Sequence, residues 1–395
     1  MIEFGSASSR KVIKVLEEAG YEAVFVGGSV RDYLLGKDAS DIDIATSASP
    51  EEVKQVFPNT IDVGIEHGTV LVLMDREPIE VTTYRTESTY TDHRRPDEVK
   101  FVKSLNEDLR RRDFTINALA LTVTGELIDP FGGRDDLKGQ VIRAVGNAHD
   151  RFMEDALRMV RAVRFASVLG FEVEANTRQA ISVNAETIRH VSVERIKVEM
   201  DKLMKGKEPN RGFALIAETG LSRHLPLFPQ DIRIISESVP YESALEGWAA
   251  LMLSGGFSAS ELARAYKLSN HEKDFLSAVQ ASFDRRQMEC YTTDDYYRFT
   301  FNVLCAAEKI WQAFNPSESG ITQHEIAMKQ SELPIRSKEE LRVNGKDLMA
   351  WTGQRGGPWL GEWMNRIEKS VLHRKCPNDT EKIKEWFLSE YKRQE

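Results

Sequence analysis

The pattern of apolar and polar positions predicts an α/β segment at the start of the chain. Apolar residues recur at helical spacing over residues 9–19, and the short apolar run at 23–26 is typical of a buried strand. Ser49, Pro50 and two following glutamates predict the capped start of another helix. Later runs with strand character lie at residues 61–63, 70–74 and 79–85. This order of elements predicts a sheet that is covered by helices.

From residue 150 onward, helical patterns replace strand patterns for the rest of the chain. The change predicts that the α/β segment ends near residue 149. Everything after it is expected to be helical.

Residues 21–46 combine a glycine turn, a short helix and two carboxylates. The strand at 23–26 stops at Gly27 and Gly28, and paired glycines let the backbone come close to a ligand. The helix that begins near Ser29 directs its free N–H groups to the same place. This arrangement is typical of a phosphate-binding site.

The next predicted strand, residues 41–44, places Asp41 and Asp43 on one face and its two isoleucines on the other. Two carboxylates about 7 Å apart on one strand face can hold hard divalent cations, with the octahedral oxygen coordination that Mg²⁺ prefers. Alone, a glycine pair is usually a turn and a D-x-D is usually a solvated strand end. In this order and spacing, each feature strengthens the interpretation of the other.

Two nearby segments add candidate residues. Glu80 is either a third carboxylate facing the metals or a solvated strand residue. Residues 86–99 are polar, charged and interrupted by a proline, which predicts a loop over the site. Its His93, Arg94 and Arg95 either contact triphosphate or primer, or belong to a solvated loop.

Residues 109–122 begin with three consecutive arginines and continue as an apolar segment that contains Asn117. Arg110, Arg111 and Arg112 cannot all be buried, although the segment that they lead resembles a core element. We therefore expect at least one of them to point into a nucleotide cleft.

Residues 154–165 predict one helix in which Asp155, Arg158, Arg161 and Arg164 recur at steps of three. Apolar residues occupy much of the remaining surface of this helix. An ordinary surface helix would pair such charges at a spacing of four, so an arginine row edged by core residues favours a ligand.

Asp155 and Arg158 together offer an acceptor beside a flat donor fork. Cytosine and adenine each present an amino donor next to a ring-nitrogen acceptor, which this pair could recognise. Uracil and guanine present the opposite pattern, and each mismatch of this kind costs about 1 to 3 kcal/mol. The pair is therefore predicted to select C and A without a nucleic acid template.

Composition and charge limit the functions and cellular locations that this chain is expected to have. The net charge of −9 argues against binding nucleic acid over the whole surface. Residues 189–211 carry seven Lys and Arg against four acids, which is either a local RNA track or a set of solvated helix faces. Three dispersed cysteines, an N-terminus without an apolar signal core and no long apolar run favour a cytoplasmic enzyme without a membrane span.

Several motifs resemble known families. The order of strand, GG, helix and D-x-D strand resembles the nucleotidyltransferase core of the polymerase β superfamily, which uses two metal ions. RRDFTINA at 111–118 and DPFGG at 129–133 resemble elements shared by tRNA nucleotidyltransferases and bacterial poly(A) polymerases. EDALRMVRAVRFA at 154–166 resembles the E-D-x-x-R element of class II tRNA nucleotidyltransferases, the CCA-adding enzymes. LRVNGKD at 341–347 and GGPWL at 356–360 resemble the tail of the Bacillus type.

This resemblance implies an α/β nucleotidyltransferase head, with a mixed or antiparallel sheet and helices, followed by an all-α neck, body and tail. The implied bounds are 1–149 for the catalytic head, 150–208 for the base-recognising neck, 209–315 for the body and 316–395 for the tRNA-binding tail.

The resemblance also implies roles for individual residues. Asp41 and Asp43 would be catalytic and hold Mg²⁺, so that the primer 3′-hydroxyl attacks the α-phosphorus and pyrophosphate leaves. Residues 193–199 would support the base-reading helix. The remaining implied roles are nucleotide-binding: Gly28 and Arg31 near the triphosphate or ribose, Arg112 at the sugar and phosphates, Asp155 and Arg158 at the base, and Arg161 and Arg164 on the triphosphate side.

The function that this implies is the addition of C, C and A to tRNA 3′ ends from CTP and ATP, with the tail following the acceptor and T arms. The alternatives are a bacterial poly(A) polymerase, an enzyme that adds only part of CCA, and an RNA-binding protein with an inactive head. The acidic balance and the tail disfavour the polymerase, and the full-length loop at 86–99 disfavours a CC-only enzyme. The sequence leaves the oligomeric state open, with a homodimer as one option.

Overall fold

The computed structural model describes residues 4–38, 42–64, 68–87 and 99–393. Asp41, His93, Arg94 and Arg95 lie outside the described residues, so their predicted roles stay predictions. The chain divides into two compact units, one of residues 1–232 with 239–244 and one of residues 233–238 with 245–395. Each unit is described by itself, and the predicted division into four domains stays a prediction.

A mixed sheet organises the first unit, as the sequence predicts. Seven strands of the described chain follow the order β3-β4-β5-β2-β1-β8-β9. The pairing of β2 with β5 is parallel, and the other neighbours are antiparallel. The strands are β1 (Ala23–Val26), β2 (Asp43–Thr46), β3 (Thr60–Gly64), β4 (Thr69–Met74), β5 (Glu77–Thr83), β8 (Ala120–Leu121) and β9 (Leu127–Ile128). A separate pair consists of β6 (Arg85–Glu87) and β7 (Val99–Phe101).

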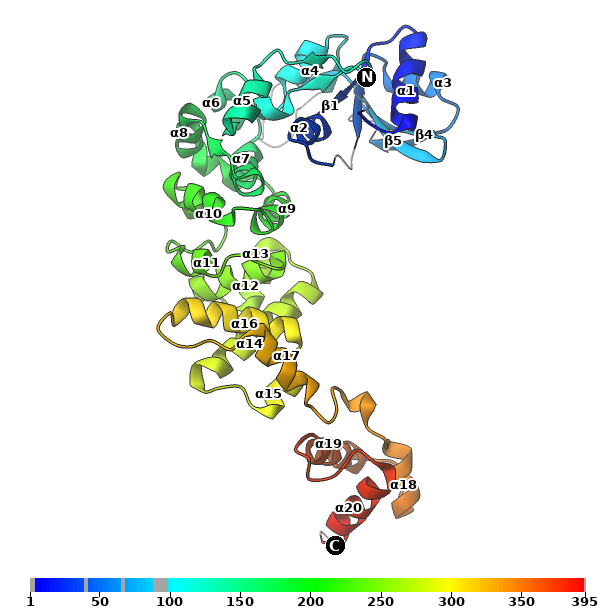
Figure 1. Ribbon diagram of the computed structural model, residues 1–395, viewed down its shortest axis with the longest axis vertical. Helices are drawn as coiled ribbons and strands as arrows, with labels where there is room; N and C mark the ends of the chain where they lie inside the picture. Colours follow the sequence, from blue (N-terminus) through cyan, green and yellow to red (C-terminus); the bar gives the residue numbers. More distant parts are fainter. Residues whose placement is uncertain (1–3, 39–41, 65–67, 88–98, 394–395) are drawn as a thin grey trace. The chain divides into compact units, whose positions relative to one another are not determined.

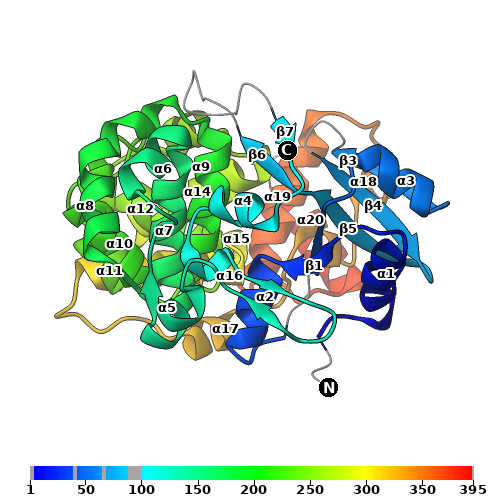
Figure 2. The same ribbon diagram turned by 90° about the horizontal axis from the view of Figure 1, so that it is seen from above.

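Helices cover the two faces of this sheet differently. On one face, α1 (Ala7–Glu18) and α3 (Pro50–Val56) pack against the strands and bury Ile13, Leu16 and Val53. On the other face, α4 (Leu105–Arg110) packs with Tyr84 over the β1 side of the sheet. Figure 2 shows α4 and the pair α1 and α3 on opposite sides of the strands. The predicted cap of α3 is confirmed, since Ser49 and Glu52 form a capping box and Pro50 begins the helix.

The helical part of the first unit follows the sheet along the chain (Figure 1). At its centre lies α7 (Leu157–Leu169), which packs against α9 and α10. The other elements are α2 (Gly28–Leu34), η2 (Thr115–Asn117), α5 (Gly133–Gly139), β10 (Val141–Ile142), α6 (Ala148–Glu154), β11 (Glu172–Val173), α8 (Ala175–Asn184), η3 (Ala185–His190), α9 (Val193–Met204), α10 (Pro209–Glu218) and η4 (Leu221–Arg223).

The prediction of one helix over residues 154–165 is wrong. Helix α6 ends at Glu154, Asp155 has an extended backbone with φ −137° and ψ 103°, and α7 begins at Leu157. The Oδ1 atom of Asp155 accepts a hydrogen bond from the Leu157 backbone N–H at 3.1 Å. A short acidic side chain competes in this way for the free N–H groups of a helix start, so it favours a break in the helix. Asp155 therefore precedes the arginine row of α7.

All regular elements of the second unit are helices among its described residues, as predicted. A first set of helices packs around α14 and α16, and a separate apolar cluster around Trp363 and Phe387 joins the last three helices. Every helix of the described chain is too short or too polar to cross a lipid bilayer. The helices are α11 (Arg233–Glu237), α12 (Ala244–Gly255), α13 (Ala259–Tyr266), α14 (Asn270–Met288), α15 (Thr293–Arg298), α16 (Phe301–Phe314), α17 (Gln323–Ser331), η5 (Lys338–Glu340), α18 (Gly345–Thr352), α19 (Pro358–Leu372) and α20 (Thr380–Lys392).

Candidate active site

The end of β1 brings a glycine, a carboxylate and an arginine together. Val26, the last residue of β1, pairs with Asp43 of β2, and Gly27 follows with φ +78°. A Cβ atom on Gly27 would lie only 3.0 Å from Arg112 Nη1 and 3.6 Å from Asp43 Oδ2. Both the backbone conformation and the close approach therefore favour glycine here. The structure thus places both Asp43 and Arg112 beside the predicted glycine turn.

Glu80 lies beside Asp43. In the parallel pairing of β2 with β5, Asp43 and Glu80 are direct partners, so their side chains leave the same face of the sheet. Asp43 is half-buried and Glu80 is exposed. Among the described residues, no group of three His, Cys, Asp or Glu forms a metal site. The two adjacent carboxylates nevertheless form a hard-oxygen donor set of the kind that suits Mg²⁺.

Gly28 is the first residue of α2, and Arg31 lies one turn later. A Cβ atom on Gly28 would lie 3.5 Å from Arg31 Nη2, so the arginine side chain runs close to the glycine backbone. Arg31 Nη2 pairs with Asp32 at 2.9 Å, and its Nη1 donates to Asn117 Oδ1 at 2.7 Å. These bonds fix the direction of a guanidinium that is 12% exposed.

Two of the three consecutive arginines share one buried acid. Asp108 is 1% exposed and pairs with Arg111 at 2.8 Å and with Arg112 at 3.2 Å. Burial alone would raise the pKa of Asp108, but the positive charges of Arg111 and Arg112 lower it below its usual value. Arg110 is exposed. Arg112 is therefore the arginine of this run that lies beside Gly27.

A network of buried acids holds the arginines of α7. Arg161 Nε donates to Asp113 Oδ2 at 2.7 Å, and Arg161 Nη1 lies 3.4 Å from Glu199. Glu199 also pairs with Arg164 at 2.7 Å. Burial would raise the pKa of Asp113, but Arg161 and a hydrogen bond from Asn117 lower it to about 2. Burial lowers the pKa of Arg164 to about 10, which leaves it charged at neutral pH.

The ring of Phe165 lies among three guanidinium groups. The Cζ atoms of Arg164, Arg31 and Arg161 lie 3.8, 5.2 and 5.6 Å from its centroid. Phe165 is buried and packs edge-on against Phe114. The electron-rich faces of an aromatic ring attract cations, so this residue helps to hold three positive charges near one another.

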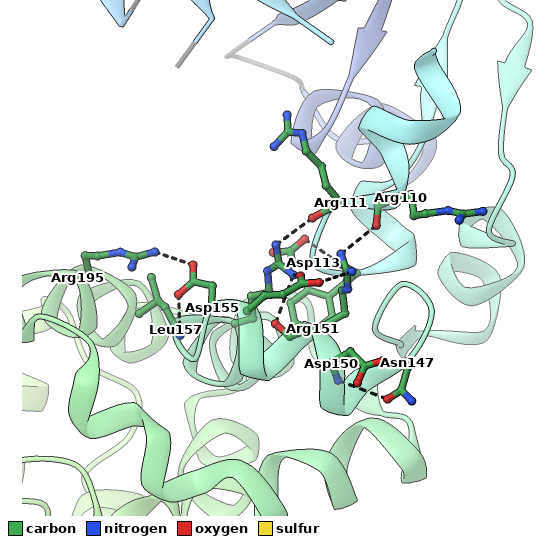
Figure 3. Close-up of polar contacts among 12 residues, drawn as sticks. Arg110, Arg111, Asp113, Asn147, Asp150, Arg151, Asp155, Leu157 and Arg195 are labelled. Carbon is green, nitrogen blue, oxygen red and sulfur yellow. Dashed lines mark hydrogen bonds and ion pairs between the residues drawn. The ribbon is translucent and has the colours of Figure 1, made fainter. Parts of the chain in front are cut away.

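Asp155 and Arg158 are held by different partners. Figure 3 shows the contacts of Asp155 with Arg195 and Leu157. Besides its bond to the Leu157 N–H, Asp155 accepts from Arg195 Nη2 at 2.7 Å. Arg158 is 6% exposed, pairs with Glu154 at 2.8 Å and donates to the backbone carbonyl of Arg111 at 2.9 Å. The predicted acceptor and donor therefore lie at the start of α7, each oriented by a charged neighbour.

The sequence interpretation missed most of the acids that orient the arginines. Asp108 and Asp113 flank the arginine run in the sequence, and this adjacency is a signal that could have identified them. Both acids are buried in the structure. Residues 193–199 make the contacts expected of a supporting segment, since Arg195 contacts Asp155 and Glu199 contacts two arginines of α7. Their role in supporting base recognition stays a prediction.

The basic segment at residues 189–211 is partly neutralised. Lys197 pairs with Asp201 at 2.8 Å, Arg189 lies 3.4 Å from Glu186, and Arg211 pairs with Glu172. Its predicted role as an RNA track stays a prediction.

Comparisons with known proteins agree with this geometry. The family model described as "Poly A polymerase head domain" matches residues 23–143. The model described as "Probable RNA and SrmB- binding site of polymerase A" matches residues 170–230. The model described as "tRNA nucleotidyltransferase domain 2 putative" matches residues 240–387. Together these matches extend over the sheet, residues 170–230 of the helical part of the first unit and most of the second unit. Helices α6 and α7 lie between the first two matches.

Relatives of similar length support the same assignment. The chain is 44% identical over 388 residues to a CCA-adding enzyme of Anoxybacillus flavithermus, with 97% of each chain covered. It is 42% identical over 384 residues to a CCA-adding enzyme of Geobacillus stearothermophilus, with 95% of each covered.

Solved structures extend the likeness to the fold. The crystal structure of the Bacillus stearothermophilus CCA-adding enzyme in complex with CTP is 39% identical, with a TM-score of 0.83 and 98% of each chain covered. The Thermotoga maritima CCA-adding enzyme complexed with tRNA, at 21% identity and a TM-score of 0.67, shares the fold over 97% of this chain and 94% of that one. The chain therefore belongs to the family of CCA-adding enzymes, which are tRNA nucleotidyltransferases.

Proposed function

We propose that this protein adds C, C and A to the 3′ end of tRNA from CTP and ATP, without a nucleic acid template. The observation that carries the proposal is the 44% identity to a CCA-adding enzyme over 97% of both chains. The structural likeness to a relative solved in complex with CTP, at 39% identity, supports the choice of nucleotide.

The phosphate side of the reaction is assigned to the oriented arginines. Arg31, Arg112, Arg161 and Arg164 bind the triphosphate, and Gly28 lets its phosphates approach the backbone of α2. Paired acids hold these guanidinium groups in fixed directions, which supports the assignment. Fixed donors need little reorganisation when charge develops on the leaving pyrophosphate, so they lower the barrier to transfer.

We assign metal binding to the carboxylates of β2 and β5. Asp43, with Asp41 and with Glu80 as a further ligand, would hold Mg²⁺, and the pairing of Asp43 with Glu80 supports this donor set. Bound Mg²⁺ would lower the pKa of the primer hydroxyl and offset the charge of the triphosphate. The glycine turn keeps Asp43 within reach of the triphosphate that Arg112 contacts.

Base selection is assigned to Asp155 and Arg158. The hydrogen bonds from Leu157 and Arg195 use two of the roughly four lone-pair positions of the Asp155 carboxylate, and the other positions accept from the amino group of C or A. Arg158 donates to the ring nitrogen. Because Arg158 also holds the carbonyl of Arg111, the residue before Arg112, base reading and phosphate binding are mechanically linked.

We assign tRNA binding to the helical parts of the chain. The basic segment at residues 189–211 follows the RNA backbone, and residues 341–347 and 356–360 contact the acceptor and T arms by shape and backbone contacts. The family-model match over residues 240–387 supports this assignment. A cytoplasmic location and a homodimer stay predictions.

A primer-extension assay tests the proposal. Purified protein is given Mg²⁺, a tRNA that lacks its CCA end, and each labelled nucleotide alone and in combination. We expect two additions from CTP alone, and one further A when ATP is present. Long A tails on any RNA indicate a poly(A) polymerase, A addition only to tRNA ending in CC indicates an A-adding enzyme, and no incorporation indicates an inactive head.

A further inference from the structure

Asn117 lies between the arginines of α2 and those of α7. It is the last residue of η2 and is 7% exposed. Its Oδ1 atom accepts from Arg31 Nη1 at 2.7 Å, and its Nδ2 atom donates to Asp113 Oδ1 at 3.0 Å. Its backbone carbonyl accepts from Arg112 Nη1 at 3.4 Å. One buried side chain thus joins a cation on one side to an anion on the other.

The amide group fits this place in one orientation. A guanidinium only donates hydrogen bonds and an ionised carboxylate only accepts them, so the neighbours of Asn117 require an acceptor and a donor on the same short side chain. Leucine has the same overall shape and provides neither. The pairing therefore depends on the amide chemistry of the residue rather than on its volume.

The contacts continue beyond Asn117 to the helical side of the site. Asp113 uses its second oxygen to hold Arg161 at 2.7 Å, and Arg161 belongs to α7. Three arginines proposed to bind the triphosphate are thus connected to Asn117: Arg31 through its side chain, Arg112 through its carbonyl, and Arg161 through Asp113.

We propose that Asn117 is a positioning residue for triphosphate binding, which fixes the direction of Arg31 and, through Asp113, that of Arg161. The proposal rests on the proposed function, because it assigns these arginines to the nucleotide. Asn117 acts on the phosphate side, which CTP and ATP share, and has no part in choosing the base. Loss of the Asn117 amide weakens the binding of CTP and of ATP equally. Guanidinium groups that are no longer held must be ordered when the nucleotide binds, and this ordering costs binding free energy.

The substitution Asn117→Leu tests this role. We expect the KM values for CTP and ATP to rise together by about tenfold, the usual effect of losing one hydrogen bond to a charged group. The preference for CTP over UTP stays unchanged. The matched control is Asn184→Leu, because Asn184 is also buried and its side-chain amide contacts the carbonyl of Ala180 and the ring of His149, away from the arginines of the site. This control keeps wild-type KM values even where its melting temperature falls.

A double-mutant cycle with Arg31→Met distinguishes a positioning role of Asn117 from a merely structural one. If Asn117 acts through Arg31, Asn117→Leu raises KM less in the Arg31→Met background than in the wild type. If Asn117→Leu does not unfold cooperatively, Asn117→Ser replaces it in both experiments, because serine is smaller than the amide, places no apolar group between Arg31 and Asp113, and cannot reach both of them at once. The serine variant is expected to show a smaller rise in KM.

Three results would overturn the inference: unchanged KM values in a folded Asn117 variant, a change in KM for one nucleotide only, or strict additivity with Arg31→Met. The wild-type enzyme keeps this failure distinct from failure of the proposed function. If the wild type adds no C or A to tRNA, the proposed function is wrong. If it adds them and the Asn117 variants bind nucleotide normally, only the role of Asn117 is wrong.

Discussion

The two sides of the candidate site are built in different ways. On the sheet side, Asp43 and Glu80 lie at the start of β2 and on β5, and Glu80 is exposed. On the helical side, the arginines of α7 lie in a network with Asp113 and Glu199, both of which are almost fully buried. The sheet side has an exposed carboxylate beside a half-buried one, and the helical side has its charges paired in the protein interior.

Because of this difference, substitutions on the two sides should have different effects on activity and on folding stability. A half-buried carboxylate contributes little to folding, so its removal should affect mainly the reaction. A buried charge whose partner is removed destabilises the protein strongly. Substitutions on the helical side should therefore reduce both stability and activity, whereas those on the sheet side should reduce activity alone.

The largest effect on activity is expected for Asp43→Asn. Loss of a metal-binding carboxylate removes several kcal/mol of transition-state stabilisation, so transfer of both C and A should fall by about a thousandfold. The melting temperature should stay within a few degrees of the wild type. Asp62→Asn on β3 is the matched control, because Asp62 is an exposed strand aspartate paired with Lys54. Loss of activity in that control, or retained activity in Asp43→Asn, would contradict the assignment.

The largest effect on stability is expected for Asp113→Asn. It leaves Arg161 without its main partner, and urea unfolding should show a loss of about 3 to 5 kcal/mol. The pKa of Asp113 is lowered from 3.8 to about 2, so its ionised form stabilises the fold above pH 3.8 and this contribution is lost as the pH falls toward 2. The wild type should lose about 2 kcal/mol over that range through this group. A variant with the same acid dependence as the wild type would argue against the ion pair.

A smaller and more selective effect is expected for Arg158→Ala. Discrimination of CTP against UTP should fall by about tenfold or more, because a base-reading contact is worth about 1 to 3 kcal/mol. Misincorporation of labelled UTP into tRNA measures this effect. A loss of rate that is equal for all nucleotides, with no misincorporation, would indicate that Arg158 only holds the Arg111 carbonyl.

The smallest effect is expected for Glu80→Gln. Its carboxylate is exposed and adjacent to Asp43, so it should assist metal binding without being essential. We expect a rise of less than about tenfold in the Mg²⁺ concentration needed for half-maximal rate, with little change in the rate at saturating Mg²⁺. A loss as large as that of Asp43→Asn would place Glu80 among the essential ligands.

The sequence predicted the parts of the site that depend on neighbouring residues. The glycine turn, the capped helix at Ser49 and the change to helices near residue 150 all follow local rules, and the structure has each of them. The predicted all-helical remainder has one exception among the described residues, the short strand β11 that pairs with β10. The break at Asp155 was missed because an aspartate inside a helix and one that binds the N–H groups of a helix start fit the same periodic pattern, although they differ in backbone conformation and in one local hydrogen bond.

The partners of the arginines could not be predicted in the same way. Asp113 and Arg161 are 48 residues apart in the chain, and Arg161 and Glu199 are 38 apart. Glu80 lies beside Asp43 only because β5 pairs in parallel with β2, although β3 and β4 lie between these two strands in the sequence. Such contacts depend on how whole elements pack, which residue spacing alone does not specify.

The most direct test of the central claim is to sequence the 3′ ends made by the wild-type enzyme. A tRNA that lacks CCA is incubated with all four nucleotides and Mg²⁺, and the added residues are read. If the neck selects bases without a template, nearly all products end in a single CCA, with no U or G. Products that carry runs of A, or U and G at frequencies that follow the nucleotide supply, would contradict the account.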